Sequence, residues 1–158
     1  MSQDLSVLRN VAIFTALGDG ELADIWNLIA LKEVGPKTKI IEEGAPVQQL
    51  CIVTDGVVHV RRIAQKKEML LTRLGPGGFF GEINLFDPGV ATASVYAMKP
   101  TQLAVIDHDA LRQYFEANPA AGYKVVTAMM REMSRRLRQT NSRLVHSAYW
   151  SAGPGDAA

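Results

Sequence analysis

The chain has 158 residues, of which 47% are hydrophobic and 21% are charged. This length suits a single domain, and the balance of apolar and charged residues is typical of a globular core, which excludes a disordered or fibrous chain. With 17 basic and 16 acidic side chains, the net charge of +1 gives the chain no overall attraction to nucleic acid or to an anionic membrane.

The sequence offers little metal or redox chemistry. Cys51 is the only cysteine, and the three histidines, His59, His108 and His146, lie far apart without ligand spacing. We therefore expect no disulfide, no metal site and no cofactor. No apolar stretch approaches the roughly 18 residues that span a bilayer, and the start of the chain lacks the pattern of a signal peptide. We expect a cytoplasmic protein without a membrane segment.

The apolar pattern is helical at first and then changes to that of strands. Apolar residues recur at helical spacing from Leu5 to Ala12 and from Leu22 to Ile29, and Asp19 is placed to cap the second helix. From about Glu33 short β-prone runs alternate with turn residues: 40–41, 50–54, 57–63, 69–74, 93–97 and 103–106. This pattern predicts a helical segment over 1–32 and an antiparallel β-sandwich or barrel over 33–107.

A helical pattern returns over 108–150, with a short helix up to Asn118 and a long one from Pro119 to about His146. Along the long helix, residues that step by three and four form a heptad seam: Val126, Met130, Met133, Leu137, Thr140 and Leu144. Such a seam favours a parallel homodimer, and the alternative is packing of the seam on the chain's own β-layer. The Gly- and Pro-containing tail 151–158 is expected to be disordered.

One member of this seam is polar. Thr140 stands where packing alone would favour Leu or Ile, and Asn141 follows it. A polar residue in a coiled-coil seam can set the register of the two helices at a cost in stability. It can equally face a polar ligand at the interface, and the helix pattern leaves both interpretations open.

A glycine-rich segment runs from Gly75 to Val95. Glycines before a short apolar turn expose backbone amides that can bind an anion. Glu82 within this segment would repel a bare phosphate, so the pattern favours an anion that also carries a hydroxyl group, such as a sugar phosphate. A glycine-rich β-turn without a ligand is the simpler alternative.

Several motifs together resemble those of a known family. They are Phe80-Gly81-Glu82-Ile83-Asn84-Leu85, then Ala91-Thr92-Ala93-Ser94-Val95, Asp55-Gly56, Lys67-Glu68-Met69-Leu70-Leu71 and Ser134-Arg135-Arg136-Leu137 before Thr140-Asn141. From Leu17 to His146 the chain resembles the cyclic-nucleotide-binding domain, in particular the effector domain of catabolite activator protein-type regulators. The resemblance implies a mainly β fold: an antiparallel, jelly-roll-like β-roll with N-terminal helices and a long C-terminal dimerisation helix.

The resemblance also implies a phosphate cassette from Gly81 to about Val95 and roles for individual residues in it. Gly81 and Ile83 match positions whose amides meet the cyclic phosphate, and Glu82 matches the acceptor of the ribose 2′-hydroxyl. Within the Thr92-Ala93 pair, Thr92 matches a hydroxyl residue that contacts phosphate. On the long helix, Arg136 matches a residue that reaches the ribose and the glutamate. Thr140 and Asn141 match positions that read the purine edge, which moves Thr140 toward the ligand-binding interpretation.

The cassette departs from the family pattern at Ala91, where the family has an arginine that pairs with the cyclic phosphate. A charge-assisted hydrogen bond contributes about 1.5–3 kcal/mol, so its absence weakens phosphate binding about ten- to a hundred-fold. Three explanations stay open. Another cation, such as Arg136 or Arg73, takes its place; the pocket binds a different ligand; or the pocket is degenerate and the fold is a ligand-independent dimerising scaffold.

We expect a stand-alone regulatory module that binds cyclic AMP or a related nucleotide and signals through a homodimer to an unknown partner protein. No Ser-His-Asp or Cys-His grouping supports an enzyme. The arginines of the long helix are better explained as a solvated helix face than as a nucleic-acid surface. Because the eight residues 151–158 are too few for a helix-turn-helix, we also expect no DNA-binding domain.

Overall fold

The computed structural model describes residues 5–152 of the chain. Three short helices come first, namely α1 (Ser6–Arg9), the 3-10 helix η1 (Ala12–Phe14) and α2 (Asp19–Leu28). The strands are β1 (Ile29–Val34), β2 (Lys39–Ile41), β3 (Gln49–Asp55), β4 (Val58–Ala64), β5 (Lys67–Leu74), β6 (Phe79–Phe80), β7 (Ser94–Ala97) and β8 (Thr101–Asp107). The remaining helices are α3 (Ile83–Phe86), α4 (His108–Ala117) and α5 (Pro119–Ala152).

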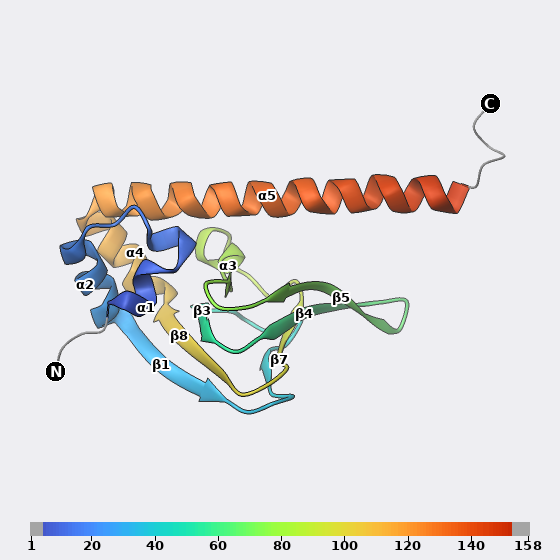
Figure 1. Ribbon diagram of the computed structural model, residues 1–158, viewed down its shortest axis with the longest axis horizontal. Coiled ribbons are helices and arrows are strands. Elements are labelled where there is room, and N and C mark those ends of the chain that lie inside the picture. The colour runs from blue at the N-terminus through green and yellow to red at the C-terminus, as the bar shows by residue number, and fades with distance from the viewer. Residues whose placement is uncertain (1–4, 153–158) are drawn as a thin grey trace.

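The strands form two four-stranded antiparallel sheets, with the orders β1-β8-β3-β6 and β2-β7-β4-β5. The sheets lie beneath α5, and the N-terminal helices and α4 gather around the first turns of that helix (Figure 1). The expected antiparallel β-roll with N-terminal helices and a long C-terminal helix is therefore confirmed.

The first strand begins earlier than the sequence pattern indicates. Residues 29–34 form β1 rather than the end of the helical segment expected over 1–32, and Ile29 pairs with Ile106 of β8. The four central residues of β1 are exposed, so this edge strand has no alternation of apolar and polar positions to reveal it. The cap of α2 also differs, because Gly18 rather than Asp19 is the N-cap residue, and its amide donates to Glu21 Oε1 at 3.0 Å.

The other end of the chain differs in a similar way. Helix α5 continues through Ala152, past the expected end near His146, so the first two residues of the tail expected to be disordered are helical. The rest of that tail, residues 153–158, lies outside the described residues. The exposed residues Leu144 and Val145 lie near the expected end of the helix. No glycine or proline follows them before residue 153, so no helix-ending residue stops α5 near His146.

Strand β3 divides the core into two clusters. Leu50 and Ile52 pack with the N-terminal helices, α4 and the start of α5, whereas Cys51 and Val53 pack between the two sheets. Successive side chains of a strand point to opposite faces, which is why one strand serves both clusters. Burial raises the pKa of Cys51 to about 12, so its thiol belongs to the core.

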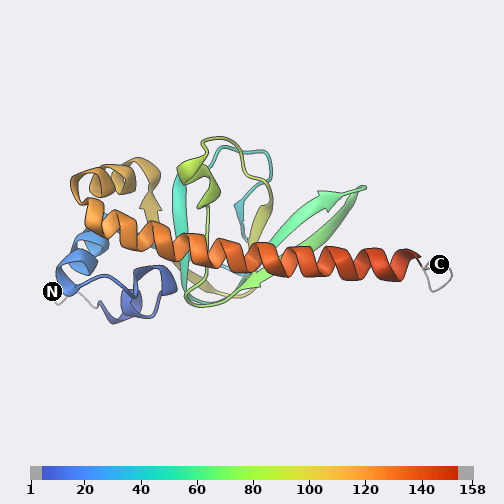
Figure 2. The ribbon, with the colours of Figure 1, turned by 90° about the horizontal axis from the view of Figure 1, so that it is seen from above.

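Helix α5 has two halves with different surroundings. Its first half buries Ala121, Val125 and Met129 against the body of the protein. Residues 137–151 are all exposed, and much of this half lies alongside the β4-β5 hairpin before the end of the helix passes beyond it (Figure 2). Within residues 5–152, none of the helices combines the length and the apolar character that crossing a membrane requires.

Candidate nucleotide-binding site

A cavity of about 360 Å³ lies between the second sheet, the glycine-rich segment and α5. We call it the roll cavity. Its lining consists of Ile41, Val47, Val60, Leu71, Thr72, Leu74, Phe79, Phe80, Gly81, Glu82, Ile83, Asn84, Ala91, Thr92, Ala93, Val95, Met133, Arg136, Gln139, Thr140 and Arg143. The structure thus brings together every site residue predicted from the sequence except Asn141.

Gly81 allows the chain to turn into the cavity. Its φ of +83° lies in the left-handed region, and a Cβ at this position would lie 2.3 Å from the Gln49 carbonyl oxygen. Only glycine fits such a close approach without a shift of the backbone. Gly81 follows β6 and precedes Glu82 and the short helix α3, so this geometry sets the direction in which Glu82 and Ile83 leave the sheet.

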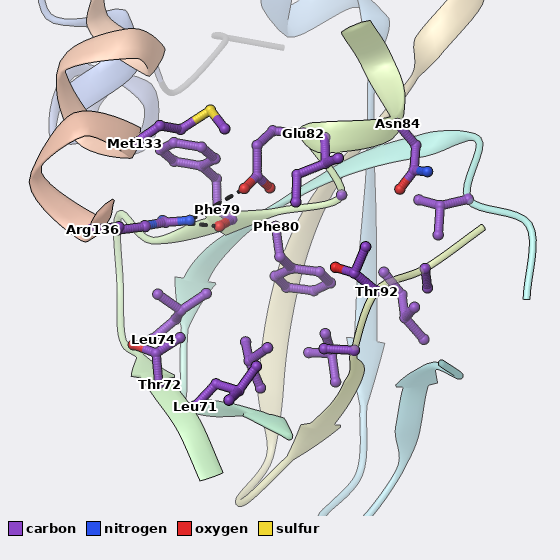
Figure 3. Close-up of a pocket in the computed structure, with 18 of the residues that line it drawn as sticks. Leu71, Thr72, Leu74, Phe79, Phe80, Glu82, Asn84, Thr92, Met133 and Arg136 are labelled. Carbon is purple, nitrogen blue, oxygen red and sulfur yellow. Dashed lines mark hydrogen bonds and ion pairs between the residues drawn. The ribbon is translucent and has the colours of Figure 1, made fainter. Parts of the chain in front are cut away.

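Glu82 and Arg136 meet across the cavity. Arg136 Nη1 lies 3.3 Å from Glu82 Oε1, and Arg136 Nη2 donates to the Phe79 carbonyl oxygen at 3.2 Å (Figure 3). The guanidinium also lies over the Phe79 ring, 4.6 Å from its centroid. Glu82 is only 6% exposed. Burial raises its pKa above the ordinary value, and the nearby Arg136 opposes that rise.

Two side chains of α4 donate hydrogen bonds to backbone carbonyls of the cassette. His108 is buried, and its Nε2 donates to the Gly81 carbonyl oxygen at 2.9 Å. Arg112 Nη2 donates to the Leu85 carbonyl oxygen at 2.8 Å, which satisfies one acceptor at the end of α3. Burial lowers the pKa of His108, and the hydrogen bond to Gly81 opposes that shift. These contacts fix the cassette relative to the helical part of the molecule.

Ala91 lines the cavity and is buried, and no cation stands at its position. Its backbone is fixed on both sides, because its amide donates to the Ala45 carbonyl oxygen at 2.8 Å and its own carbonyl accepts from Gly44 at 2.9 Å. The neighbouring Thr92 points into the same space from the segment just before β7 (Figure 3).

Two arginines, Arg136 and Arg143, line the cavity, and both come from α5. The idea that Arg73 replaces the family arginine is wrong. Arg73 does not line the cavity, because its neighbour Leu74 points inward and Arg73 Nε donates instead to His59 Nε2 at 3.2 Å. Arg143 was missed as a site residue. It is one heptad beyond Arg136, a spacing that returns to nearly the same helix face, and its Nη1 donates to the Leu71 carbonyl oxygen at 3.1 Å.

Thr140 and Asn141 lie on different sides of α5. Thr140 lines the cavity, and its hydroxyl donates to the Arg136 carbonyl oxygen at 3.0 Å. Asn141 does not line the cavity and lies instead in a shallow surface hollow with Val145 and Tyr149. Within a single chain the structure therefore separates the two residues that the resemblance assigned to the purine edge.

Comparisons with known proteins indicate one family for this chain. The sequence model of the cyclic nucleotide-binding domain matches residues 31–118. A CRP-like cAMP-activated global transcriptional regulator of Mycobacterium tuberculosis is 30% identical over 139 residues, which cover 87% of this chain and 60% of that regulator. The chain thus spans less than two thirds of this relative's length.

Solved structures show the same fold. The N-terminal domain of a transcriptional regulator from Streptomyces coelicolor A3(2) is 31% identical, with a TM-score of 0.71, and the match covers 86% of this chain and 95% of that one. The regulatory subunit of a cAMP-independent protein kinase A from Trypanosoma brucei shares the fold at 20% identity, with a TM-score of 0.74 over 89% of this chain and 50% of that one.

Proposed function

Because the chain belongs to the cyclic nucleotide-binding domain family, a family of regulatory domains rather than enzymes, we propose that it binds a cyclic nucleotide in the roll cavity and transmits the binding through α5. Cyclic AMP or a close relative is the proposed ligand. The pair of buried Glu82 and partly exposed Arg136 beside Gly81 carries this proposal, because it joins the cassette to the helix at the place where a nucleotide would touch both.

Each cassette residue has a proposed role that agrees with its position. The amides after the Gly81 turn and the Thr92 hydroxyl contact the cyclic phosphate, beside Ala93 in the same wall. Glu82 accepts the ribose 2′-hydroxyl, with Arg136 alongside. Thr140 lies one helical turn further along α5, next to the purine. Glu82 disfavours a bare phosphate, whereas a ribose hydroxyl gives this carboxylate a donor.

The missing arginine sets the expected affinity. With Ala91 in its place, the phosphate loses a charge-assisted hydrogen bond, which lowers affinity about ten- to a hundred-fold. Arg136 already pairs with Glu82, and Arg143 binds the Leu71 carbonyl oxygen. We therefore propose weak binding of the nucleotide in comparison with a cassette that keeps its arginine.

The proposed output is a parallel homodimer through α5. Apolar side chains recur at heptad spacing on the helix and are exposed in the single chain, with Met130 62%, Leu137 61% and Leu144 63% exposed. A second copy of the helix would cover them. Asn141 lies outside the cavity of its own chain, so it would contact a ligand only in the cavity of the second chain of this dimer. A ligand that contacts both the β-roll and α5 then biases the dimer, and through it an unidentified partner protein. A cytoplasmic location remains part of this proposal.

A ligand-independent dimerising scaffold is the second candidate. It is favoured by the way Glu82 and Arg136 satisfy each other, and by the finding that no buried side-chain nitrogen or oxygen in residues 5–152 is without a hydrogen-bond partner. A protein kinase regulatory subunit with the same fold is described as cAMP-independent, so the fold alone does not guarantee binding of this nucleotide.

A thermal-shift series separates the two candidates. Cyclic AMP should raise the melting temperature of the wild-type protein more than 5′-AMP does, because ligand that binds only the folded state stabilises it. The shift should disappear in Arg136→Gln and persist in Arg138→Gln, which removes the same charge from an exposed position of α5. Equal melting temperatures with and without cyclic AMP in the wild type would favour the scaffold.

A further inference from the structure

Arg143 lies at the end of the roll cavity farthest from the cassette. It lines the cavity from α5, and its Nη1 donates to the Leu71 carbonyl oxygen of β5 at 3.1 Å. Leu71 and Glu82 lie at opposite ends of the labelled side chains (Figure 3). Arg143 is also seven residues beyond Arg136, or about 10 Å along the helix axis. Glu82 and Arg136 therefore mark one end of the cavity, and Arg143 marks the other.

This position corresponds to the base of a nucleotide bound as described under the proposed function. The phosphate and the ribose lie at the cassette end, so the purine extends along α5 past Thr140. Arg143 follows Thr140 by three residues, a spacing that places two side chains on one face of a helix. The inference rests on the proposed function and concerns which base the cavity prefers.

The guanidinium of Arg143 has donors to offer to a base. An arginine carries five N–H groups and no acceptor, and the Leu71 carbonyl oxygen accepts from one of them. Within residues 5–152, Arg143 forms no ion pair with an acidic side chain. The bond to β5 holds the guanidinium at the edge of the cavity, where its other N–H groups can bind acceptors of a ligand.

The two common purines differ in what they present to such a group. Guanine has two neighbouring acceptors, O6 and N7, which an arginine can bind together. Adenine has N7, but its N6 amino group is a donor and would face the donors of Arg143.

Two other polar residues of α5 at this end do not distinguish the bases. The Thr140 hydroxyl already donates to the Arg136 carbonyl oxygen, so it offers a base an acceptor, and both purines have an amino group that can donate to it. Gln139 also lines the cavity, and its amide carries both a donor and an acceptor, which can turn to suit either base. Of these three residues, Arg143 alone discriminates.

We propose that Arg143 binds O6 and N7 of the purine and that the roll cavity therefore prefers cyclic GMP to cyclic AMP. Arg143 is exposed, so water competes for its donors and the preference belongs to the lower part of the range for a bidentate contact, about ten-fold. Cyclic IMP keeps O6 and N7 but lacks the 2-amino group of guanine, so it should bind about as tightly as cyclic GMP.

Competition of the three cyclic nucleotides against a fluorescent cyclic nucleotide tests this preference. In the wild type, cyclic GMP and cyclic IMP should bind about ten-fold more tightly than cyclic AMP. Arg143→Met keeps a long side chain but loses the N–H groups, so it should bind all three with similar affinity, because only cyclic GMP and cyclic IMP lose a contact. Arg138→Met, which changes an exposed arginine of the same helix in the same way, should keep the wild-type preference.

The outcomes separate this inference from the function on which it rests. An unchanged ratio of cyclic GMP to cyclic AMP affinity in Arg143→Met would overturn the role of Arg143, as would an equal loss for all three nucleotides. Cyclic IMP that binds as weakly as cyclic AMP would also overturn it, because the 2-amino group would then be the recognised feature. Binding of none of the three to the wild type would overturn the proposed function itself.

Discussion

Substitution of Ala91 by arginine tests how far the cassette has departed from its family. The Ala91 backbone is held by hydrogen bonds to Gly44 and Ala45 on either side, so a longer side chain would extend from a fixed position on the cavity wall. One new charge-assisted hydrogen bond to the cyclic phosphate contributes about 1.5–3 kcal/mol, or about ten- to a hundred-fold in affinity. This figure is a net contribution, and ordering the longer side chain takes back a further part of the gain.

The net expectation is that Ala91→Arg binds cyclic AMP at least several-fold more tightly than the wild type. Competition against a fluorescent cyclic nucleotide measures the change. Ala91→Met is the matched control, because it adds a long side chain to the same buried position without a charge. The reasoning is refuted if the arginine and methionine variants bind cyclic AMP equally well, because residue 91 would then not face the phosphate.

Three further substitutions probe the cassette and the helix. Burial raises the pKa of Glu82 above its ordinary value of 4.5, so the wild type loses stability as the pH rises from that value through the raised pKa. Glu82→Gln has no charge to bury, so it should match wild-type stability at low pH and exceed it at higher pH. Denaturation at several pH values measures the difference. Gly81→Ala should lower the free energy of unfolding by at least about 1–3 kcal/mol, whereas Gly75→Ala, with open space around its Cβ, should cost much less in the same denaturation assay. Leu137→Asp should shift the protein to a monomer in sedimentation experiments, and Arg138→Asp, outside the seam, should leave the dimer intact.

The parts of the site that depend on local sequence could be predicted. The Gly81 turn, Glu82 and the Thr92-Ala93 pair lie in one continuous segment, and helical spacing places Arg136 and Thr140 on one face of α5. The same spacing could have identified Arg143. Likewise, the alternation along β5 could have placed Arg73 outside, since Leu74 beside it is an inward-facing residue.

Other features depend on contacts between distant parts of the chain. His108 and Arg112 hold the cassette from a helix that follows it by more than one strand, and no local pattern indicates this contact. Strand β1 exists because it pairs with β8, although its exposed centre gives no alternating pattern. The separation of Asn141 from Thr140 follows from the position of α5 over the β-roll, which sequence spacing does not specify.

Calorimetric titration of the wild-type protein with cyclic AMP and with cyclic GMP tests the central proposal most directly. We predict saturable heat with at least one of them, together with a rise in melting temperature, at an affinity weakened by the absence of the cassette arginine. No heat and no change in melting temperature with either nucleotide at millimolar concentration would contradict the proposal, and the roll cavity would then belong to a scaffold whose Glu82–Arg136 pair is structural.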